Sequence, residues 1–321
     1  MSICEQELER EKKEKMRAAV YDEYGSDFNR IAVRSMPTPK VFPGSVLIHV
    51  RAASVNPVDW KLSTGALDGV IDAVFPVIPG WDVSGVVVAT GPDTPEWTIG
   101  DEVLANARKD TLQAGTFAEL VAVPAWLLAR KPAQLPWDQA GGLPLAGGTA
   151  LRTLDAIGVS AQSTVVIYGA GGAVGSLGVQ IARARGARVI GTASPRNHGY
   201  LQELGAEAVA YGDGLADRIL QLAPTGVDAV ADFVGGQYGT TKLILKAVGQ
   251  HASVVDSTVL KHGGQHIWVR PDATELRRLT DLVNQGKLTI RVGATYDLSG
   301  VPRAFSASQE RRVQGKIVIV P

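Results

Sequence analysis

A glycine-rich segment in the middle of the chain has the residue types and spacing of a phosphate-binding turn. It follows an apolar run at residues 164–168 and consists of Gly169-Ala170-Gly171-Gly172-Ala173-Val174-Gly175. Gly172 would let the backbone approach a pyrophosphate, and Gly175 would let the following helix pack close to the sheet. The N–H groups and the positive dipole end of that helix would then face the phosphates. The segment predicts dinucleotide binding through residues 169–174, and the alternative is a glycine-rich turn that only packs.

The end of the next expected strand, 187–191, distinguishes between two dinucleotides. In proteins that bind NAD, an acidic residue about 20 positions after the glycine turn holds the ribose 2′-OH. Here the strand leads into residues 192–197, which contain neither Asp nor Glu. Ser194 can donate a hydrogen bond to a phosphate, and Arg196 can pair with it through two N–H groups. The sequence therefore favours NADP(H), and the alternative for Arg196 is a solvated loop arginine.

Metal ligands are sparse in the sequence. The chain has one cysteine, Cys4, and none of its five histidines stands in a ligand-spaced pair with it. His262 and His266 are four residues apart, but two glycines between them disfavour a shared helix face. We therefore expect no metal site.

With NADPH and no metal, we expect direct hydride transfer to an electron-poor acceptor, such as a quinone or an α,β-unsaturated carbonyl compound.

A polar cluster at residues 54–61 follows an apolar strand in the first part of the chain. Asn56 could hydrogen-bond a nicotinamide ribose or a substrate, and Lys61 could donate to a developing oxyanion. These two side chains are our candidates for catalysis. The alternative is a polar turn in which Trp60 packs into the core.

The first part of the chain consists of short apolar strands. Residues 17–135 contain many of them, separated by Pro and Gly, which is typical of a barrel-like all-β domain. The chain closes with the apolar strand 317–320, which we expect to return to this domain. The β domain would then be discontinuous, with residues 16–136 and 261–321, and residues 1–15 would form an N-terminal extension.

Between residues 137 and 260 the pattern changes. A helix-like stretch at 137–157 is interrupted near Pro144, and strands and helices then alternate. This alternation predicts a doubly wound parallel sheet with helices on both faces. Towards its end we expect a helix at 238–247 and a strand at 252–256. The fold class is α/β, with a dinucleotide-binding domain at 137–260.

The bulk composition excludes several classes of protein. The 321 residues indicate two domains, and Lys+Arg and Asp+Glu are both 32, for a formal net charge of zero. We therefore expect no nucleic acid and no anionic membrane as a partner. No apolar run reaches the roughly 18 residues of a spanning helix, and the charged start is unlike a secretory signal. We expect a cytoplasmic protein.

At these residues the sequence resembles the medium-chain dehydrogenase/reductase superfamily, in its zinc-free quinone oxidoreductase branch. The resemblance covers nearly everything from Met16 to Pro321. The matching pieces are turns and strand ends: Ala53–Asp59, Pro79–Val87, Thr98–Val103, Gly115–Glu119, Gly148–Ala150, Gly169–Gly175, Phe233–Gly236 and Gly315–Val318.

The resemblance implies a GroES-like β-barrel catalytic domain and a Rossmann domain, with the active site in the cleft between them. It also implies contacts to the cofactor beyond the glycine turn. These are Asn56 and Thr149 near the nicotinamide, Ser194, Arg196 and Tyr211 near the 2′-phosphate, and Val234, Gly235 and Lys316 as further cofactor-binding residues.

Two departures from the family pattern concern the chemistry. Zinc members have a catalytic cysteine where Asn56 stands and a Gly-His-Glu where Gly80-Trp81-Asp82 stands, so the resemblance implies that the metal is lost. The tyrosine near the substrate of similar quinone reductases falls at Lys61, an arrangement closer to alkenal or enone reductases. The family commonly forms dimers through the Rossmann domain, so a homodimer is expected, with Val248–Val255 as a candidate edge.

Three functions remain open from the sequence. The first is an NADPH-dependent reductase of quinones or α,β-unsaturated carbonyls, with an alkenal/enone carbon–carbon double-bond reductase as a more specific form. The second is a catalytically weak NADPH-binding protein. The third, a metal-dependent alcohol dehydrogenase, is opposed by the missing ligands.

Overall fold

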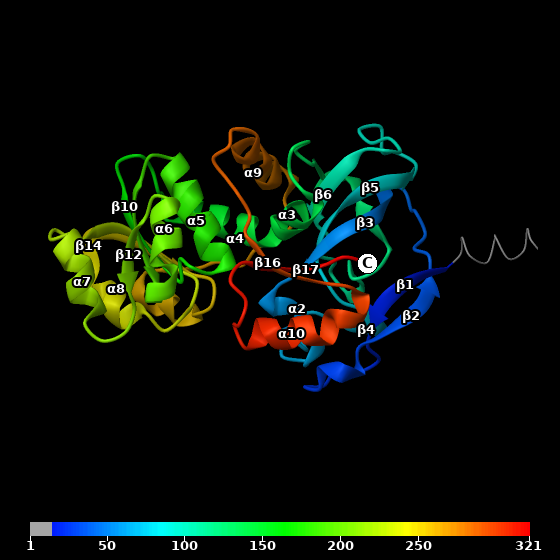
Figure 1. Cartoon of the computed structure of the whole chain (residues 1–321), viewed down its shortest axis with the longest axis horizontal. Coiled ribbons are helices and arrows are strands. Elements are labelled where there is room, and N and C mark those ends of the chain that lie inside the picture. Colours follow the sequence, from blue (N-terminus) through cyan, green and yellow to red (C-terminus); the bar gives the residue numbers. More distant parts are fainter. Residues whose placement is uncertain (1–14) are drawn as a thin grey trace, which may run out of the picture. The chain divides into compact units, whose positions relative to one another are not determined.

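The computed structural model describes residues 15–321, which form two compact units. The first unit contains the described residues up to Leu145 together with 271–280 and 291–321, and the second contains 146–270 and 281–290. The domain boundaries expected from the sequence stay a prediction. The extension expected at residues 1–15 lies outside the described residues, apart from Lys15, which begins the first strand (Figure 1).

Short strands make up most of the first unit. In chain order they are β1 (Lys15–Val20), β2 (Ala32–Pro37), β3 (Ser45–Val55), β4 (Ala73–Ile78), β5 (Asp82–Thr90), β6 (Glu102–Asn106), β7 (Leu112–Ala114), β8 (Leu120–Pro124), β9 (Ala129–Arg130), β16 (Val292–Tyr296) and β17 (Lys316–Ile319). Its helices include α2 (Pro57–Ser63), α3 (Trp137–Gly142) and α10 (Val301–Gln309). In the described part of the chain, its largest sheet has the order β16-β17-β3-β5-β6-β9, with β8 also paired to β3.

Strand β3 is the central strand of this sheet. It pairs antiparallel with β5, with β8 over its first residues and with β17 over its last. Nearly all of its residues are buried, as expected for an apolar strand that is covered on both faces. The pairing with β17 confirms that the end of the chain returns to the β sheet. This pairing also decides which side chains surround the carboxyl end of β3.

The second unit is a parallel sheet with helices. Its strands are β10 (Thr164–Tyr168), β11 (Arg188–Ala193), β12 (Glu207–Ala210), β13 (Val227–Asp232), β14 (Leu245–Ser253) and β15 (Gln265–His266). Its helices are α4 (Pro144–Ala156, from residue 146), α5 (Ala173–Ala184), α6 (His198–Glu203), α7 (Leu215–Leu222) and α8 (Tyr238–Ile244), and α9 (Ala273–Asn284) is shared with the first unit. Among the described residues the strand order is β12-β11-β10-β13-β14-β15, and all pairs are parallel.

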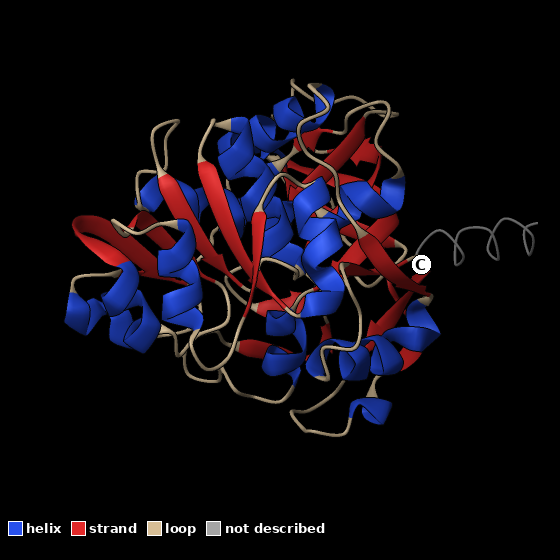
Figure 2. Cartoon of the chain, turned by 60° about the vertical axis from the view of Figure 1, so that its left-hand side comes forward, coloured by secondary structure: helices blue, strands red, loops and turns tan. Residues whose placement is uncertain are grey.

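This strand order confirms the doubly wound sheet. Counted along the chain from β10, the order is 3-2-1-4-5-6, which is that of dinucleotide-binding sheets. Figure 2 shows these strands as neighbouring arrows with helices packed against them. The break that was expected near Pro144 separates α3 from α4. In a sheet of this order, ligands bind outside the carboxyl ends of the strands, where the first and fourth strands diverge.

The sequence misplaced one helix end. The helix expected at 238–247 ends at Ile244, and β14 already begins at Leu245, seven residues before the expected strand. Leu245 pairs with Val227 of β13, so a partner far away in the sequence decides the backbone conformation here. Short apolar runs fit a helix or a strand equally well, and the local pattern therefore carried no information on this boundary.

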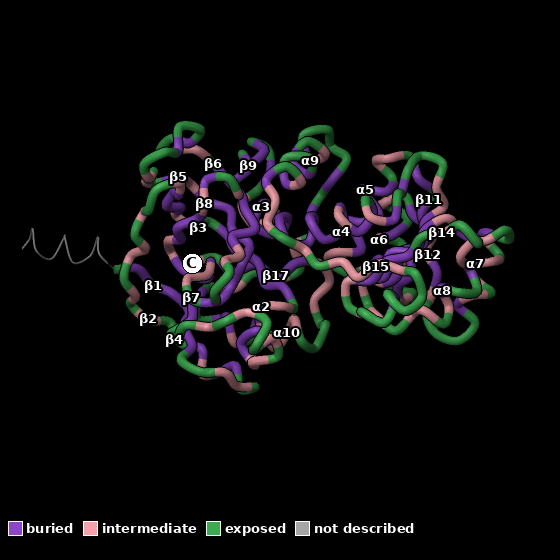
Figure 3. The backbone as a smooth tube through the Cα atoms, turned by 180° about the vertical axis from the view of Figure 1, so that it is seen from behind, coloured by how far each residue is buried: buried purple, intermediate pink, exposed green. Residues whose placement is uncertain are grey.

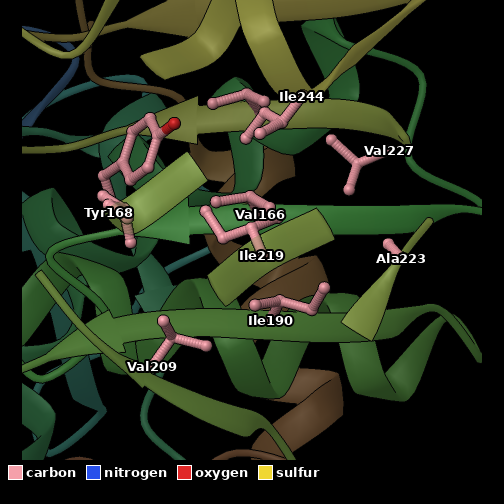
Figure 4. Close-up of a cluster of buried hydrophobic side chains, with 10 residues drawn as sticks. Val166, Tyr168, Ile190, Val209, Ile219, Ala223, Val227 and Ile244 are labelled. Atoms are coloured by element: carbon pink, nitrogen blue, oxygen red, sulfur yellow. The ribbon is translucent and has the colours of Figure 1, made fainter. Parts of the chain in front are cut away.

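The core of the second unit is formed by the parallel strands and the helix α7. Val166, Ile190 and Val209 from three strands pack with Ile219 of α7 (Figure 4). The burial pattern follows from this packing, because the central strands β10, β11 and β13 are mostly buried while most connecting loops are exposed (Figure 3). In residues 15–321 we find no helix that is long and apolar enough to cross a membrane.

Candidate functional site

The glycine turn after β10 is held in place by the neighbouring strand β11. Gly169 has a positive φ of +74°, a conformation that favours glycine. Its N–H donates to Thr192 Oγ1 at 3.1 Å, and the N–H of Ala170 donates to the Thr192 carbonyl at 3.0 Å. The turn thus has two contacts to one residue at the carboxyl end of β11, which fix its position at the edge of the sheet.

Gly175 allows close packing between α5 and this turn, as predicted. A Cβ atom built on Gly175 would lie 2.2 Å from the Gly169 carbonyl oxygen and 2.7 Å from Ala170 Cα. Both atoms belong to the backbone, so no side chain could move away to make room. Position 175 therefore requires glycine, because the helix approaches the turn too closely for a Cβ atom.

The first turn of α5 follows the glycine turn directly, since the helix begins at Ala173. The first bond within the helix is donated by Ser176 N to the Gly172 carbonyl oxygen at 2.9 Å. The N–H groups that precede it, on Ala173, Val174 and Gly175, belong to the first turn, where helix N–H groups lack partners within the helix. N–H groups of this kind, together with the positive end of a helix dipole, can bind a pyrophosphate, and its binding at this turn stays a prediction.

The other predicted cofactor residues of the second unit follow the neighbouring strands. Because the sheet is parallel, the carboxyl ends of β11, β12 and β13 lie at one edge. The residues that follow these ends are Ser194 and Arg196 after β11, Tyr211 after β12, and Val234 and Gly235 after β13. The structure therefore brings five residues that are spread over about forty positions of the chain to the edge that carries the glycine turn.

Two close approaches show that these loops are neighbours. A Cβ atom built on Gly169 would lie 2.6 Å from Val234 Cγ1, and one built on Gly171 would lie 2.9 Å from Asn197 Nδ2. Arg196 is exposed and, within the part of the chain that the structure describes, its side chain makes no hydrogen bond or ion pair. Tyr211 is 64% exposed. Both side chains are therefore accessible to a ligand at this edge.

Thr149 lies on α4 and is buried. Its carbonyl oxygen accepts a hydrogen bond from Thr153 Oγ1 at 2.7 Å, which is a contact within the helix. Its predicted role near the nicotinamide stays a prediction.

Asp232, which the sequence analysis missed, organises the loop after β13. Its Oδ1 accepts hydrogen bonds from the N–H groups of Val234 and Gly235, each at 2.9 Å, and its Oδ2 accepts one from Ser253 Oγ at 3.0 Å. The carboxylate thus fixes the backbone of both predicted cofactor residues. The signal that could have identified it was an aspartate at the end of an apolar strand, three residues before a pair of glycines.

In the first unit, strand register brings together residues that are far apart in the sequence. Ile317 of β17 lies opposite Val55 of β3, so Lys316 lies beside Asn56 at the end of the strand. Ser84 of β5 lies opposite Ala52, which places Asp82 near the same end. Three strands therefore contribute the surroundings of Asn56.

Asn56 is buried in a network of hydrogen bonds. Its Oδ1 accepts from Lys316 Nζ at 2.7 Å, and its Nδ2 donates to Asp82 Oδ2 at 2.9 Å and to the Ser54 carbonyl at 3.3 Å. Its backbone N–H donates to Asp59 Oδ2 at 2.7 Å. The contacts of Oδ1 and Nδ2 fix the orientation of the amide, and Asn56 is only 2% exposed.

Lys316 and Asp82 form the charged part of this network. Lys316 is 3% exposed, and its Nζ also contacts the Val55 carbonyl at 3.2 Å and Asp82 Oδ2 at 3.7 Å. Burial lowers the pKa of Lys316 and raises that of Asp82, and each charge opposes the effect on the other. Asp82 Oδ1 accepts the N–H of Leu145 at 2.8 Å, so every oxygen of this carboxylate has a partner. The ammonium group of Lys316 is therefore bonded to other protein atoms in the interior of this unit.

Lys61 lies on α2 but is not part of this network. It is exposed, with Nζ 5.7 Å from the centroid of the Trp60 ring. Trp60 is half-buried, and its Nε1 has no hydrogen-bond partner among the described residues. The structure therefore separates the two candidate catalytic residues, Asn56 in the interior and Lys61 at the surface of the unit.

Among residues 15–321, no group of three or more His, Cys, Asp and Glu side chains is arranged to hold a metal ion. The cluster at the end of β3 instead contains an amide, an ammonium group and carboxylates.

Comparisons with known proteins agree with this architecture. A family model described as the alcohol dehydrogenase GroES-like domain matches residues 42–133, and one described as a zinc-binding dehydrogenase matches residues 204–319. The chain is 33% identical to an NADPH-dependent alkenal/one oxidoreductase from the chloroplast of Arabidopsis thaliana, over 95% of this chain and 80% of that protein. It is 31% identical to a 2-methylene-furan-3-one reductase of Solanum lycopersicum, over 95% and 79%.

A solved structure is similar over almost its whole length. The quinone oxidoreductase from Coxiella burnetii superposes with a TM-score of 0.84 at 32% identity, covering 96% of this chain and 99% of that one.

The chain belongs to the medium-chain dehydrogenase/reductase superfamily, among its quinone and alkenal oxidoreductases. It is an oxidoreductase of this group that uses a nicotinamide cofactor.

Proposed function

We propose that this protein is an NADPH-dependent reductase that transfers a hydride to a quinone or an α,β-unsaturated carbonyl compound without zinc. The relatives named above support this class of acceptors, since they include an alkenal/one oxidoreductase, a 2-methylene-furan-3-one reductase and a quinone oxidoreductase. The observation that carries the choice of cofactor is Arg196, an exposed and unpaired arginine that follows β11 where NAD-binding proteins have an acid.

The residues of the second unit would bind and orient the cofactor. The glycine turn and the first turn of α5 bind the pyrophosphate, and Ser194, Arg196 and Tyr211 contact the 2′-phosphate. Val234 and Gly235, held by Asp232, line the path of the cofactor at the carboxyl edge. The bound cofactor supplies the hydride, and the protein provides its orientation.

The residues of the first unit would act on the acceptor and the nicotinamide end. Asn56, fixed by Lys316 and Asp82, accepts a hydrogen bond from a ribose or substrate hydroxyl. Lys61, with its exposed ammonium group, donates to the oxyanion that develops on the acceptor. In this proposal Lys316 contributes through Asn56 rather than by direct contact.

The experiment that tests this function is NADPH oxidation across a panel of quinones, enals and enones, repeated with NADH. We expect turnover with NADPH that exceeds the rate without protein for at least one class of acceptor. Turnover with NADPH that is no faster than in the absence of protein, for every acceptor, would instead leave a catalytically weak NADPH-binding protein. Stoichiometric zinc, together with activity that is lost on chelation, would contradict the zinc-free mechanism.

A pair of variants tests the choice between NADPH and NADH. Arg196→Ala should weaken NADPH binding by about 10- to 100-fold, the loss of a charged hydrogen bond, and leave NADH binding unchanged. Lys242→Ala is the matched control, because Lys242 lies in the last turn of α8, at the opposite edge of the sheet. Equal NADPH affinity of the Arg196→Ala variant and the wild type would remove the assignment.

We also infer that the protein is a homodimer, because members of the family commonly form dimers. From the composition we infer a cytoplasmic location. Light scattering gives the mass in solution, and fractionation of cells gives the location. A monomer or an organellar location would correct either point.

A further inference from the structure

A pocket in the first unit contains a buried carboxyl group that the proposed mechanism does not use. Asp59 lines this pocket together with Lys109, Tyr21 and Trp81, and apolar residues from the strands and loops around them form most of the rest. The cavity volume is about 20 Å³, which is room for about one water molecule. The pocket is partly open to solvent.

The two oxygens of Asp59 have different surroundings. Oδ2 accepts the backbone N–H of Asn56 at 2.7 Å, so it must present a lone pair there. Oδ1 is buried and has no hydrogen-bond partner among the described residues. A buried carboxyl oxygen without a partner is costly, and a proton on Oδ1 that bonds a water molecule in the cavity removes this cost.

Burial makes the protonated form of Asp59 dominant near neutral pH. Removal from solvent raises its pKa from 3.8 to about 8, and the nearby Asp82 carboxylate acts in the same direction. The N–H of Asn56 and the charge of Lys316 oppose this rise. Tyr21, which also lines the pocket, is close enough for its own pKa to be raised in part by Asp59.

Lys109 lines the same pocket, and its pKa is close to that of Asp59. Its Nζ donates to the Ala114 carbonyl at 2.8 Å, and burial lowers its pKa from 10.5 to about 8. Proton transfer between groups is efficient when their pKa values are similar and close to the working pH. One water molecule between Asp59 and Lys109 would complete a path from solvent to the buried carboxyl group.

We propose that Asp59 is the proton source for the α-carbon of an α,β-unsaturated carbonyl acceptor, acting through a water molecule in this pocket, and that Lys109 restores the proton. This inference rests on the proposed reductase function. The hydride, with its electron pair, forms the C–H bond at the β-carbon, and the π electrons of the double bond move to give an enolate. The α-carbon then takes a proton from the water, which takes one from Asp59 as its O–H bond breaks. Lys109 protonates the carboxylate and regains its proton from solvent.

Quinones provide a comparison that separates this role from a structural one. Reduction of a quinone ends with protons on oxygen, which exchange with water without help from the protein. Reduction of an enal requires protonation at carbon, which is slow without a positioned donor. A proton source for carbon therefore affects enals and leaves quinones unchanged.

The test uses Asp59→Asn in the full-length protein, assayed with a quinone and with an α-methyl enal in deuterated water. The asparagine oxygen can still accept the N–H of Asn56, so the start of α2 is preserved. We expect enal turnover to fall by about 100-fold or more, quinone turnover to stay close to wild type, and deuterium at the α-carbon to lose its stereospecificity. Lys109→Met should show the same preference for quinones. Asp68→Asn, the same change at an exposed aspartate of this unit, should change neither reaction.

Several results would overturn the proposal. Equal losses with both acceptors would make Asp59 a structural residue, and stereospecific labelling by the Asp59→Asn variant would place the donor elsewhere. Wild-type protein that reduces quinones but no enal would also exclude the role. Carboxyl NMR of the cofactor-free protein tests the proposal independently of turnover, because titration of Asp59 below about pH 5 would remove the proton that it needs. Absence of turnover with every acceptor would instead refute the reductase function.

Discussion

The contact between α5 and the glycine turn allows a sharp prediction about one substitution. In Gly175→Ala the new Cβ atom would lie 2.2 Å from the Gly169 carbonyl oxygen. The helix or the turn must move by roughly 1 Å to reach an ordinary contact, and overpacking of this kind costs about 1–3 kcal/mol. Gly178→Ala in the same helix is the control, because its Cβ atom would meet only side-chain atoms, at 3.3 Å from Phe233 and 3.5 Å from Ile167.

Both variants gain the helix propensity of alanine, which is about 1 kcal/mol per residue, so their difference isolates the contact. We expect Gly178→Ala to be neutral or slightly more stable than wild type, and Gly175→Ala to be less stable than Gly178→Ala by about 2 kcal/mol. Urea unfolding followed by circular dichroism measures this difference. Fluorescence titration with NADPH should show weaker binding for Gly175→Ala alone, since the displaced turn no longer presents its N–H groups correctly. Equal stability and equal affinity of the two variants would refute the reasoning.

Other predictions concern the buried charges. Lys316→Met should lower the free energy of unfolding by about 3–5 kcal/mol, because it leaves Asp82 buried without its cation, and the double variant with Asp82→Asn should recover part of this loss in urea unfolding. Asp59, whose folded pKa is raised to about 8, stabilises the fold fully below about pH 4 and loses this contribution as the pH rises to about 8. Asp59→Asn should therefore gain stability relative to wild type across this window, by at most about 1.4 kcal/mol per pH unit, and a difference that does not vary with pH would contradict the assignment. Asp232→Ala should weaken NADPH binding in a fluorescence titration and lower stability by about 1–3 kcal/mol, since three donors lose their acceptor.

The local structure around the glycine turn could be predicted closely from the sequence. The glycine turn, the helix after it and the loop with Ser194 and Arg196 lie within about thirty residues of one another. Their structure follows from local rules, namely strand periodicity, glycine conformation and helix termination. Because parallel strands share an edge, the positions of Tyr211 and Val234 follow as soon as the order of the strands is known.

The surroundings of Asn56 were decided only by the tertiary structure. Lys316 reaches Asn56 across 260 positions of the sequence, through the register of β17 against β3, and no local pattern specifies that register. The spacing of Asn56 and Asp59 was itself a signal, since a side chain three residues after a helix start can accept the N–H there. The burial that gives Asp59 its unusual proton affinity, and the exposure that separates Lys61 from Asn56, depend on packing in three dimensions. The sequence alone determined the residue types and the glycine-rich turn. Long-range pairing of strands decided which of these residues contact one another and which are buried.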